Sequence, residues 1–273
     1  MSEEAAPSAA AAARPRIGAA AALLGASILL SRVIGYVREM VLAREVGAGA
    51  SMDAYRAAFQ LPDMLNHLLA GGALSIAFIP LYRRTLEQRG AAAAERLFAT
   101  VLGTTGAAVV LATAALCWWA EPLTALQFGG FDAETRALAV RLTRIVLPAQ
   151  IFFLTGGILR GAAMAHGRFG SQAAAPLVYN AAIIAGGLCW PEPGPEGFAW
   201  GVLVGAALGG FLISVRDAGS AVRLRARVAP FDADLLRYLA IAAPLMLGAS
   251  LLTVHEWYER WFADELGAGA MAR

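Results

Sequence analysis

Long apolar runs, separated by short polar connections, set the elements that this chain is predicted to form. About 20 helical residues at about 1.5 Å each cross a hydrocarbon layer of about 30 Å. Seven runs reach that length, namely residues 17–43, 54–81, 97–119, 137–160, 172–190, 198–215 and 236–262. The pattern therefore predicts an all-α, polytopic membrane protein with about seven transmembrane helices.

Composition supports a membrane protein. Hydrophobic residues make up 59% of the 273 residues and charged residues 15%, whereas roughly a quarter of a soluble domain is charged. The alanine-rich residues 1–16 are of low complexity, and we predict a disordered N-terminus there. A signal peptide over residues 14–30 is the alternative, but no clear cleavage stretch follows and the apolar run continues.

The basic residues predict the orientation. All 22 of them are arginine, and they gather before the first expected span and in the second, fourth and sixth connections. The positive-inside rule therefore places the N-terminus and the even connections in the cytoplasm. Aromatic residues favour the same topology, because tryptophans settle at membrane interfaces and all six fall at the expected outer boundary. They are Trp118, Trp119, Trp190, Trp200, Trp257 and Trp261.

The first span carries a polar stripe. On a helical wheel one arc of roughly 140° holds its polar and small positions. They are Ser27, Ser31, Arg32, Gly35, Arg38 and Glu39. A charge near the bilayer centre costs about 3 kcal/mol, so Arg32 is expected to face protein or water and to mark a ligand or pathway. Arg38 lies nearer the helix end, where snorkelling to the headgroups is the alternative.

The second span repeats this arrangement. An arc of about 80° holds a second set of polar and small positions, with Asn66 just outside it. The set is Asp53, Arg56, Gln60, Asp63, His67 and Gly71, and Pro62 is expected to kink this helix. We expect both stripes to face one hydrated cavity. The alternative is that Asp53 and Arg56 are interfacial and that Asp63 caps a break at the proline.

Arginine indicates the chemistry of such a cavity. Its guanidinium stays charged and forms a planar fork that matches phosphate, so an anionic, phosphate-bearing substrate is expected. We find no P-loop, HExxH, Cys/His cluster or GxSxG. We therefore expect no enzyme activity, catalytic residue, cofactor, metal or nucleic-acid partner.

Cys117 and Cys189 both fall near the outer face. A disulfide between them is geometrically conceivable, and buried free thiols are favoured.

Two stretches resemble a known family. They are "SRVIGYVREMVLAREVGAGASMDAYRAAFQLPDMLNHLLAGGALSIAFIPLY" and "LTRIVLPAQIFFLTGGILRGAAMAHGRFGSQAAAPLVYN". They resemble the MurJ/MviN family of lipid II flippases, and the likeness covers roughly residues 20–265. The family belongs to the multidrug/oligosaccharidyl-lipid/polysaccharide exporter superfamily. The resemblance implies an alternating cavity between two lobes that moves lipid II, a disaccharide-pentapeptide on undecaprenyl pyrophosphate, from the inner to the outer leaflet of the bacterial cytoplasmic membrane.

The resemblance also implies residue roles. Arg32 and Arg38 match the family arginines associated with the pyrophosphate, and Asp53 matches the family aspartate. We expect these three to bind substrate, with Ser31, Gly35, Glu39, Arg56, Gln60, Asp63, Asn66 and His67 lining the cavity. The sequence departs from the family where Asn66 and His67 stand near the place of a third arginine, and where Gly71 replaces a glutamate.

By this resemblance the chain corresponds to the N-terminal lobe of a two-lobe transporter. The expected organisation is a disordered cytoplasmic segment over 1–16, a seven-span lobe over 17–262 and a truncated outer-side tail over 263–273. A second lobe or another copy of the chain is then an expected partner, beside the lipid substrate and the bilayer. Two alternatives remain: an exporter of another lipid-linked glycan, or an inactive or partner-requiring half-transporter.

Overall fold

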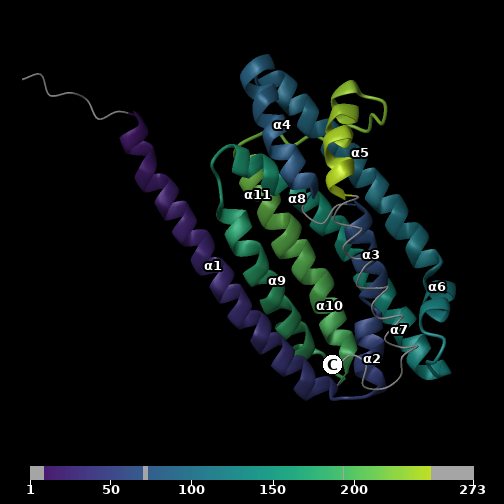
Figure 1. The fold of residues 1–273 in the computed structure, drawn as a ribbon. Helices are drawn as coiled ribbons and strands as arrows, with labels where there is room; N and C mark the ends of the chain where they lie inside the picture. The colour runs from purple at the N-terminus through teal and green to yellow at the C-terminus, as the bar shows by residue number, and fades with distance from the viewer. Residues whose placement is uncertain (1–8, 70–72, 193, 247–273) are drawn as a thin grey trace, which may run out of the picture.

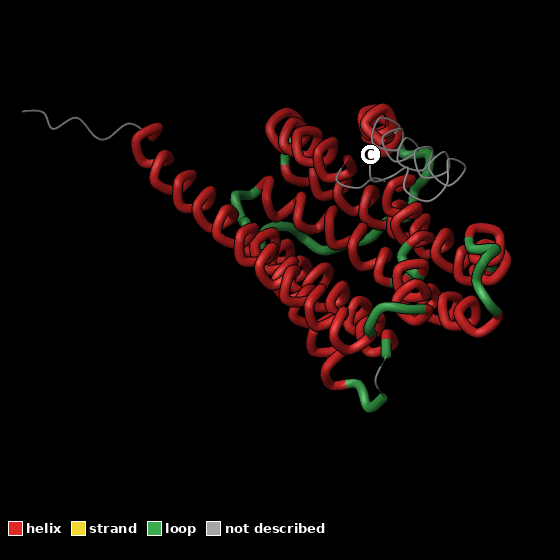
Figure 2. Tube along the Cα trace, turned by 60° about the horizontal axis from the view of Figure 1, so that its bottom comes forward, coloured by secondary structure: helices red, strands yellow, loops and turns green. Residues whose placement is uncertain are grey.

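Helices and their connections make up the whole of the described chain. A computed structural model describes residues 9–69, 73–192 and 194–246, and those ranges contain no strand (Figures 1 and 2). The helices are α1 (Ala9–Val46), α2 (Ala50–Ala57), α3 (Gln60–Leu69), α4 (Ala73–Arg89), α5 (Ala91–Trp118), α6 (Ala120–Gln127), α7 (Ala133–Val146), α8 (Ala149–Ala165), α9 (Gly170–Cys189), α10 (Pro195–Gly205), the π-helical η1 (Ala206–Leu212) and α11 (Ile213–Gly219). A last helix covers residues 233–246.

Four helical stretches within the described residues are long and apolar enough to cross a membrane. They are α5, the α7–α8 pair, α9, and the α10–η1–α11 run. They coincide with the third to sixth expected spans, so the protein is an all-α, polytopic membrane protein. The first expected span lies within α1. The seventh, over 236–262, extends beyond residue 246 and so lies partly outside the described residues.

The first helix starts earlier than expected. It begins at Ala9 and therefore includes part of the segment over 1–16 that was expected to be disordered. Alanine has the highest helix propensity, and five consecutive alanines, residues 9–13, open the helix. The N-terminal part of α1 projects from the bundle in both Figure 1 and Figure 2.

The second expected span is not one helix, so the prediction of a single kinked helix over 54–81 is wrong. The helix breaks at residues 58 and 59, and Pro62 stands in the first turn of α3. A proline ring collides with the carbonyl four residues earlier, here that of Ala58, and proline has no N–H to donate. The break therefore precedes the proline by one turn. Residues 70–72 lie outside the described residues, and α4 follows them.

A second interruption shapes the sixth span. Residues 206–212 form π-helical turns, which leave backbone groups differently placed from those of an α-helix. The Nη1 of Arg160 donates to the Gly210 carbonyl at 2.8 Å, and the Ser214 hydroxyl donates to the same oxygen at 2.7 Å. Gly156 of α8 lies so close that a Cβ there would stand 2.0 Å from that oxygen. The arginine thus links α8 to the widened turns.

The two larger apolar clusters of the described residues hold the helices together. In the first, Phe78 packs on Tyr82, Phe98 and Tyr238 with ring centroids 5.4 to 6.4 Å apart, which joins α4 and α5 to the last helix. In the second, Tyr55 of α2 meets Phe198 of α10 edge to face, at 6.4 Å. The clusters fix both halves of the broken second span against the long helices.

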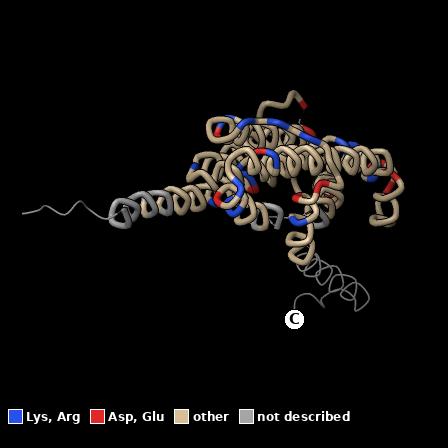
Figure 3. The backbone as a smooth tube through the Cα atoms, turned by 90° about the horizontal axis from the view of Figure 1, so that it is seen from above, with Lys and Arg blue, Asp and Glu red and all other residues tan. Residues whose placement is uncertain are grey.

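The bundle has two chemically different ends. One end holds the α4–α5 connection, the α8–α9 connection and the segment after α11; the other holds α2, the α6–α7 connection and the start of α10 (Figure 1). Exposed arginines gather at the first end, and Figure 3 looks down on it. They are Arg83, Arg84, Arg89, Arg96, Arg168, Arg216, Arg223, Arg225, Arg227 and Arg237. We call it the arginine-rich end.

An extended segment over residues 223–230, here called the strap, lies along α5 at this end. The Arg227 backbone N–H donates to the Ala99 carbonyl at 2.8 Å, and the Ala229 N–H donates to the Thr104 hydroxyl at 3.0 Å. Gly103 makes this approach possible, because a Cβ at that position would lie 2.5 Å from the Arg227 backbone.

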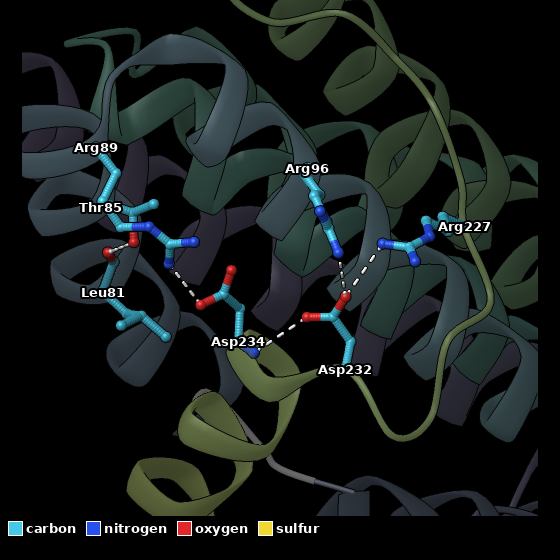
Figure 4. A network of polar contacts seen from close by, with 7 residues as sticks. All are labelled: Leu81, Thr85, Arg89, Arg96, Arg227, Asp232 and Asp234. Atoms are coloured by element: carbon cyan, nitrogen blue, oxygen red, sulfur yellow. Dashed lines mark hydrogen bonds and ion pairs between the residues drawn. The ribbon is translucent and has the colours of Figure 1, made fainter.

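Ion pairs secure the connection after the strap (Figure 4). Asp232, whose side chain is 8% exposed, accepts hydrogen bonds from Arg96 at 3.3 Å and Arg227 at 3.1 Å. Arg89 of α4 pairs with Asp234 at 2.6 Å. Burial acts to raise the pKa of Asp232, but the Asp234 N–H and the two guanidinium groups hold the pKa below its ordinary value.

Substitution of Gly103 by Ala should loosen the strap. The added methyl group collides with backbone rather than with a flexible side chain, so the free energy of unfolding should fall by about 1 to 3 kcal/mol. Thermal unfolding of the detergent-solubilised chain measures this. Gly25→Ala on α1, where a Cβ meets nothing within 4 Å, is the control and should leave the melting temperature unchanged or raise it. Equal melting temperatures for Gly103→Ala and the parent would contradict the close approach.

Substitution of Asp232 by Asn should remove a pH-dependent contribution to stability. Because the folded-state pKa is lowered, the ionised carboxylate stabilises fully above its unfolded pKa of about 3.9, and this contribution is lost as the pH falls through the lower folded value. Asp232→Asn should lower the free energy of unfolding by about 1 to 2 kcal/mol at pH 7 and flatten its decline below about pH 4. Denaturant titrations at several pH values measure both. The exposed Glu87→Gln is the control; a parallel decline for Asp232→Asn and the parent would contradict the role.

Candidate functional site

Arg38 is a charged residue of the first helix that another helix holds in place. Its side chain is 27% exposed, and its Nη1 donates to the Oδ1 of Asn180 on α9 at 3.0 Å. Its Nε and Nη2 donate to Oε1 of Glu39 at 3.2 and 2.5 Å. The guanidinium is therefore fixed from two sides, by a neutral amide and by a carboxylate that is 56% exposed.

Three small positions of the polar stripe lie against α9. Ser27 is buried and its hydroxyl donates to the Ala173 carbonyl. The Nδ2 of Asn180 donates to the Ser31 hydroxyl at 3.4 Å, and a Cβ on Gly35 would lie 4.0 Å from the same amide. Ser31 and Gly35, expected to line a cavity, thus lie at the α1–α9 contact. A polar stripe can be satisfied by a neighbouring helix as well as by water.

A pocket of about 250 Å³ opens beside Arg38. Its walls come from α1, α2, the break after α2, and α9, so the first and second expected spans do share one concave surface. Its lining residues are Arg38, Glu39, Leu42, Tyr55, Arg56, Phe59, Tyr179 and Ile183. Two guanidinium groups and one carboxylate face a mainly aromatic and aliphatic wall. Such a site can hold an anion while the apolar wall contacts the remainder of a ligand.

The other two expected substrate-binding residues lie elsewhere. Arg32 is exposed on α1 and does not line this pocket. Asp53 is exposed on α2 and lines a separate small pocket together with Gly47 and Arg56. Arg56 lines both pockets and so lies between Arg38 and Asp53. The structure brings Arg38, Glu39 and Arg56 together, with Asp53 one step removed.

The remaining expected residues of the second span are distributed over α3. Gln60 and Asn66 are half-buried, and Asp63 is exposed. The break at residues 58 and 59 separates them from Asp53 and Arg56, so the continuous arc assumed for one straight helix does not exist. The side chain of His67 and all of Gly71 lie outside the described residues.

The sequence-based set lacks Tyr55 and Tyr179, which line the pocket, and Asn180, which holds Arg38. Asn180 holds Arg38 and also donates to the Pro176 carbonyl at 2.9 Å, so its amide uses both of its ends. A buried amide in the middle of an apolar span is itself a signal of function, and it could have identified Asn180. The two tyrosines could not be chosen, because aromatic side chains are common in any helix core.

Other candidate groups stay apart from this pocket. Cys117 and Cys189 are free thiols, half-buried and exposed respectively, so the expectation of two buried thiols is wrong for Cys189. The Nε2 of His166 lies 3.0 Å from the Tyr82 hydroxyl, in a structural contact. Among the described residues, no group of three or more His, Cys, Asp or Glu side chains is placed to hold a metal ion.

Comparisons with known proteins point to one family. The family described as "Lipid II flippase MurJ" matches residues 42–273. A Burkholderia cenocepacia protein named "Lipid II flippase MurJ" is 30% identical over 257 residues, covering 89% of this chain and 49% of its own length. A Rhizobium tropici protein named "Probable lipid II flippase MurJ" is 28% identical, over 85% of this chain and 45% of its own. The chain thus spans about half the length of these relatives.

Solved structures share the fold. A lipid II flippase MurJ in an inward closed conformation superposes with a TM-score of 0.68 at 21% identity, covering 83% of this chain and 47% of that chain. A Vibrio cholerae MATE transporter gives a TM-score of 0.71 at 15% identity, covering 96% and 59%. In both cases the match extends over about half of a larger transporter.

Substitution of Asn180 by Ala should release Arg38. Without the amide oxygen the guanidinium keeps only its exposed partner Glu39, so its modification by phenylglyoxal in detergent should increase about threefold or more. Peptide mass spectrometry measures the modified fraction. Arg32, already exposed, is the internal reference and should react equally in both proteins, whereas Asn180→Asp should protect Arg38. Equal labelling of Arg38 in the parent and in Asn180→Ala would show that the amide does not hold it.

Proposed function

The chain belongs to the MurJ family, and from this premise we propose that it supplies the N-terminal lobe of a lipid II flippase. The proposed reaction moves a disaccharide-pentapeptide on undecaprenyl pyrophosphate from the inner to the outer leaflet. One observation carries the proposal: on the first expected span, Arg38 is held by Asn180 and faces a pocket of about 250 Å³. A fixed guanidinium at that depth fits a pyrophosphate that must leave water.

Arg38 and Arg56 would bind the pyrophosphate in this scheme. Guanidinium groups donate paired hydrogen bonds to phosphate oxygens, and these two line the same pocket. The aromatic wall formed by Tyr55, Phe59 and Tyr179 would contact the apolar or sugar part of the ligand next to the phosphates. Arg32, exposed on the same helix, would meet the ligand from outside the pocket as it enters or leaves.

Glu39 supplies a route to release. It pairs with Arg38 at 2.5 Å, so a pyrophosphate must displace it to bind and it can displace the pyrophosphate afterwards. This competition keeps affinity moderate, as alternating access requires. Asp53 forms no ion pair among the described residues. When the cavity faces the other leaflet, Asp53 would compete with the pyrophosphate for Arg56 in the same way.

A second lobe or another copy of the chain would complete the cavity. The relatives are about twice as long, and the family resemblance implies a cavity between two lobes. By the positive-inside rule the arginine-rich end would face the cytoplasm, and the N-terminus would lie on the same side. The membrane would be the cytoplasmic membrane of a bacterium.

Binding of lipid II tests this function. With the chain in nanodiscs, Arg38→Gln should weaken lipid II binding about tenfold or more, because one charge-assisted pair is lost. Glu39→Gln should strengthen binding several-fold, because a competitor is lost while the guanidinium remains. Microscale thermophoresis with labelled chain measures both. Arg84→Gln, an exposed arginine outside the pocket, is the matched control and should bind as the parent does.

Two further results bear on the same proposal. If undecaprenyl phosphate binds as tightly as lipid II, the pyrophosphate and glycan are not recognised and the substrate assignment fails. Transport itself is read from a chimera in which this chain replaces the corresponding half of the Burkholderia cenocepacia relative, in a strain depleted of its own flippase. The parent chimera should restore growth and its Arg38→Ala form should not. Growth supported equally by both would exclude an essential role for Arg38.

A further inference from the structure

A larger pocket lies at the end of the bundle opposite the arginine-rich end. Its volume is about 770 Å³, and its walls come from α6, α7, the start of α8, and α10. Neither Arg38 nor any other residue of the smaller pocket lines it. It is therefore a separate site, which the proposed flipping mechanism does not use.

Three arginines of α7 face this pocket. Arg136, Arg141 and Arg144 bring three positive charges, and Glu121 is the carboxylate that lines it with them. Glu196 of α10 pairs with Arg141 at 2.6 Å, so two carboxylates stand against three guanidinium groups. The balance is one positive charge, and the ion pair is open to competition because the Arg141 side chain is 62% exposed.

The arginines retain unused donors. Arg136 donates through Nη2 to the carbonyls of Phe131 and Gly129 at 3.0 and 3.4 Å, but its Nε is buried without a hydrogen-bond partner in the described chain. Arg144 donates through Nε to the Cys117 carbonyl at 3.3 Å. Each guanidinium has five N–H donors. The exposed side chains of Arg141 and Arg144 leave N–H groups beyond these partners, to which a phosphate can bind.

The rest of the wall is apolar and lies at an expected membrane interface. Val140, Ile145, Pro148 and Leu203 line the pocket, and Trp200 stands at its side, stacked on Trp190 with ring centroids 6.4 Å apart. Tryptophans concentrate where headgroups meet hydrocarbon. Arg141 and Arg144 lie inside the fourth expected span, about 6 and 10 Å along the helix from its first residue at position 137. The charges therefore extend below the surface, where a free anion from solution is disfavoured.

We propose that this pocket binds the phosphate of an anionic membrane lipid from the leaflet at that end, with an acyl chain against the apolar wall. Arg141 and Arg144 bind the phosphate oxygens, and Arg136, which is tied to the α6–α7 connection, closes the pocket on that side. Glu196 is the competing anion, which holds Arg141 when the lipid is absent. The bound lipid joins α7 to α10 and so stabilises the end of the bundle where the strap is absent.

Short-chain lipids test the assignment in detergent solution. The probes are dihexanoyl phosphatidylglycerol, dihexanoyl phosphatidylcholine and inorganic phosphate, with binding to the 273-residue chain measured by native mass spectrometry and by the shift in melting temperature. Phosphatidylglycerol should bind tightest, because it combines a net negative phosphate with acyl chains. If inorganic phosphate binds as tightly, the site is a free-anion site and the lipid assignment is overturned. Preference for phosphatidylcholine would overturn the role of charge.

Paired variants separate binding from folding. Arg141→Gln should weaken phosphatidylglycerol binding about tenfold and Arg141→Lys should restore part of it, whereas Glu196→Gln should tighten it several-fold. If the Arg141–Glu196 ion pair were purely structural, removing either charge would affect lipid binding in the same direction, so opposite effects of the two substitutions indicate a role in binding. Arg225→Gln on the strap is the control for non-specific attraction. Unchanged binding in Arg141→Gln, or weaker binding in Glu196→Gln, would overturn the proposal. These residues lie outside the Arg38 pocket, so this result and the lipid II result are independent.

Discussion

A charged side chain on an apolar helix needs polar partners from the protein, and this constraint organises the first helix. Arg38 is satisfied by the amide of Asn180 and the carboxylate of Glu39. That requirement fixes the face of α1 that packs on α9, and Ser27 and Ser31 lie on the same face. The helix contact, the position of the guanidinium and the pocket beside it therefore share one physical cause.

Backbone groups obey the same constraint where helices are interrupted. Within a bilayer a free carbonyl has no water to bind, so each break needs a partner from the protein. At the π-helical turns the partner is Arg160, which donates to the Gly210 carbonyl. At the break before α3 the chain re-forms its bonds at once, since the Asp63 N–H donates to the Phe59 carbonyl at 2.8 Å. The interruptions are thus ordered features, and the break before α3 gives the Arg38 pocket part of its wall.

Local sequence predicted the features that depend on composition along one helix. The third to sixth spans follow from apolar length, and the arginine-rich end follows from counting arginines between them. The local sequence did not predict the features that depend on contact between helices. The wheel of α1 identified Ser31 and Gly35 as one face but could not tell that α9 rather than water lies against it. The wheel of the second span assumed a straight helix, and the break before Pro62 removed that assumption.

The sequence did not predict the pocket lined by Arg136, Arg141 and Arg144 of α7, for a related reason. Arg141 and Arg144 lie in the fourth expected span, five and eight residues after Arg136, a spacing that also suits an ordinary solvated face. Only the packing of α10 beside α7 gives them a wall and the partner Glu196.

Arg32 and Arg38 have different environments, and the difference bears on the proposed mechanism. Arg38 is preorganised by two partners, which lowers the cost of ordering it when a ligand binds. Arg32 is exposed on a helix face where Leu29 and Tyr36 are also 68% and 69% exposed. Hydrocarbon alone on that face would impose about 3 kcal/mol for the charge, and protein or a water-filled cavity would remove that cost. The exposed face of α1 is therefore the surface on which the proposed second lobe would complete the pathway. There Arg38 would hold the pyrophosphate, and the exposed Arg32 would contact it as it enters or leaves the pocket.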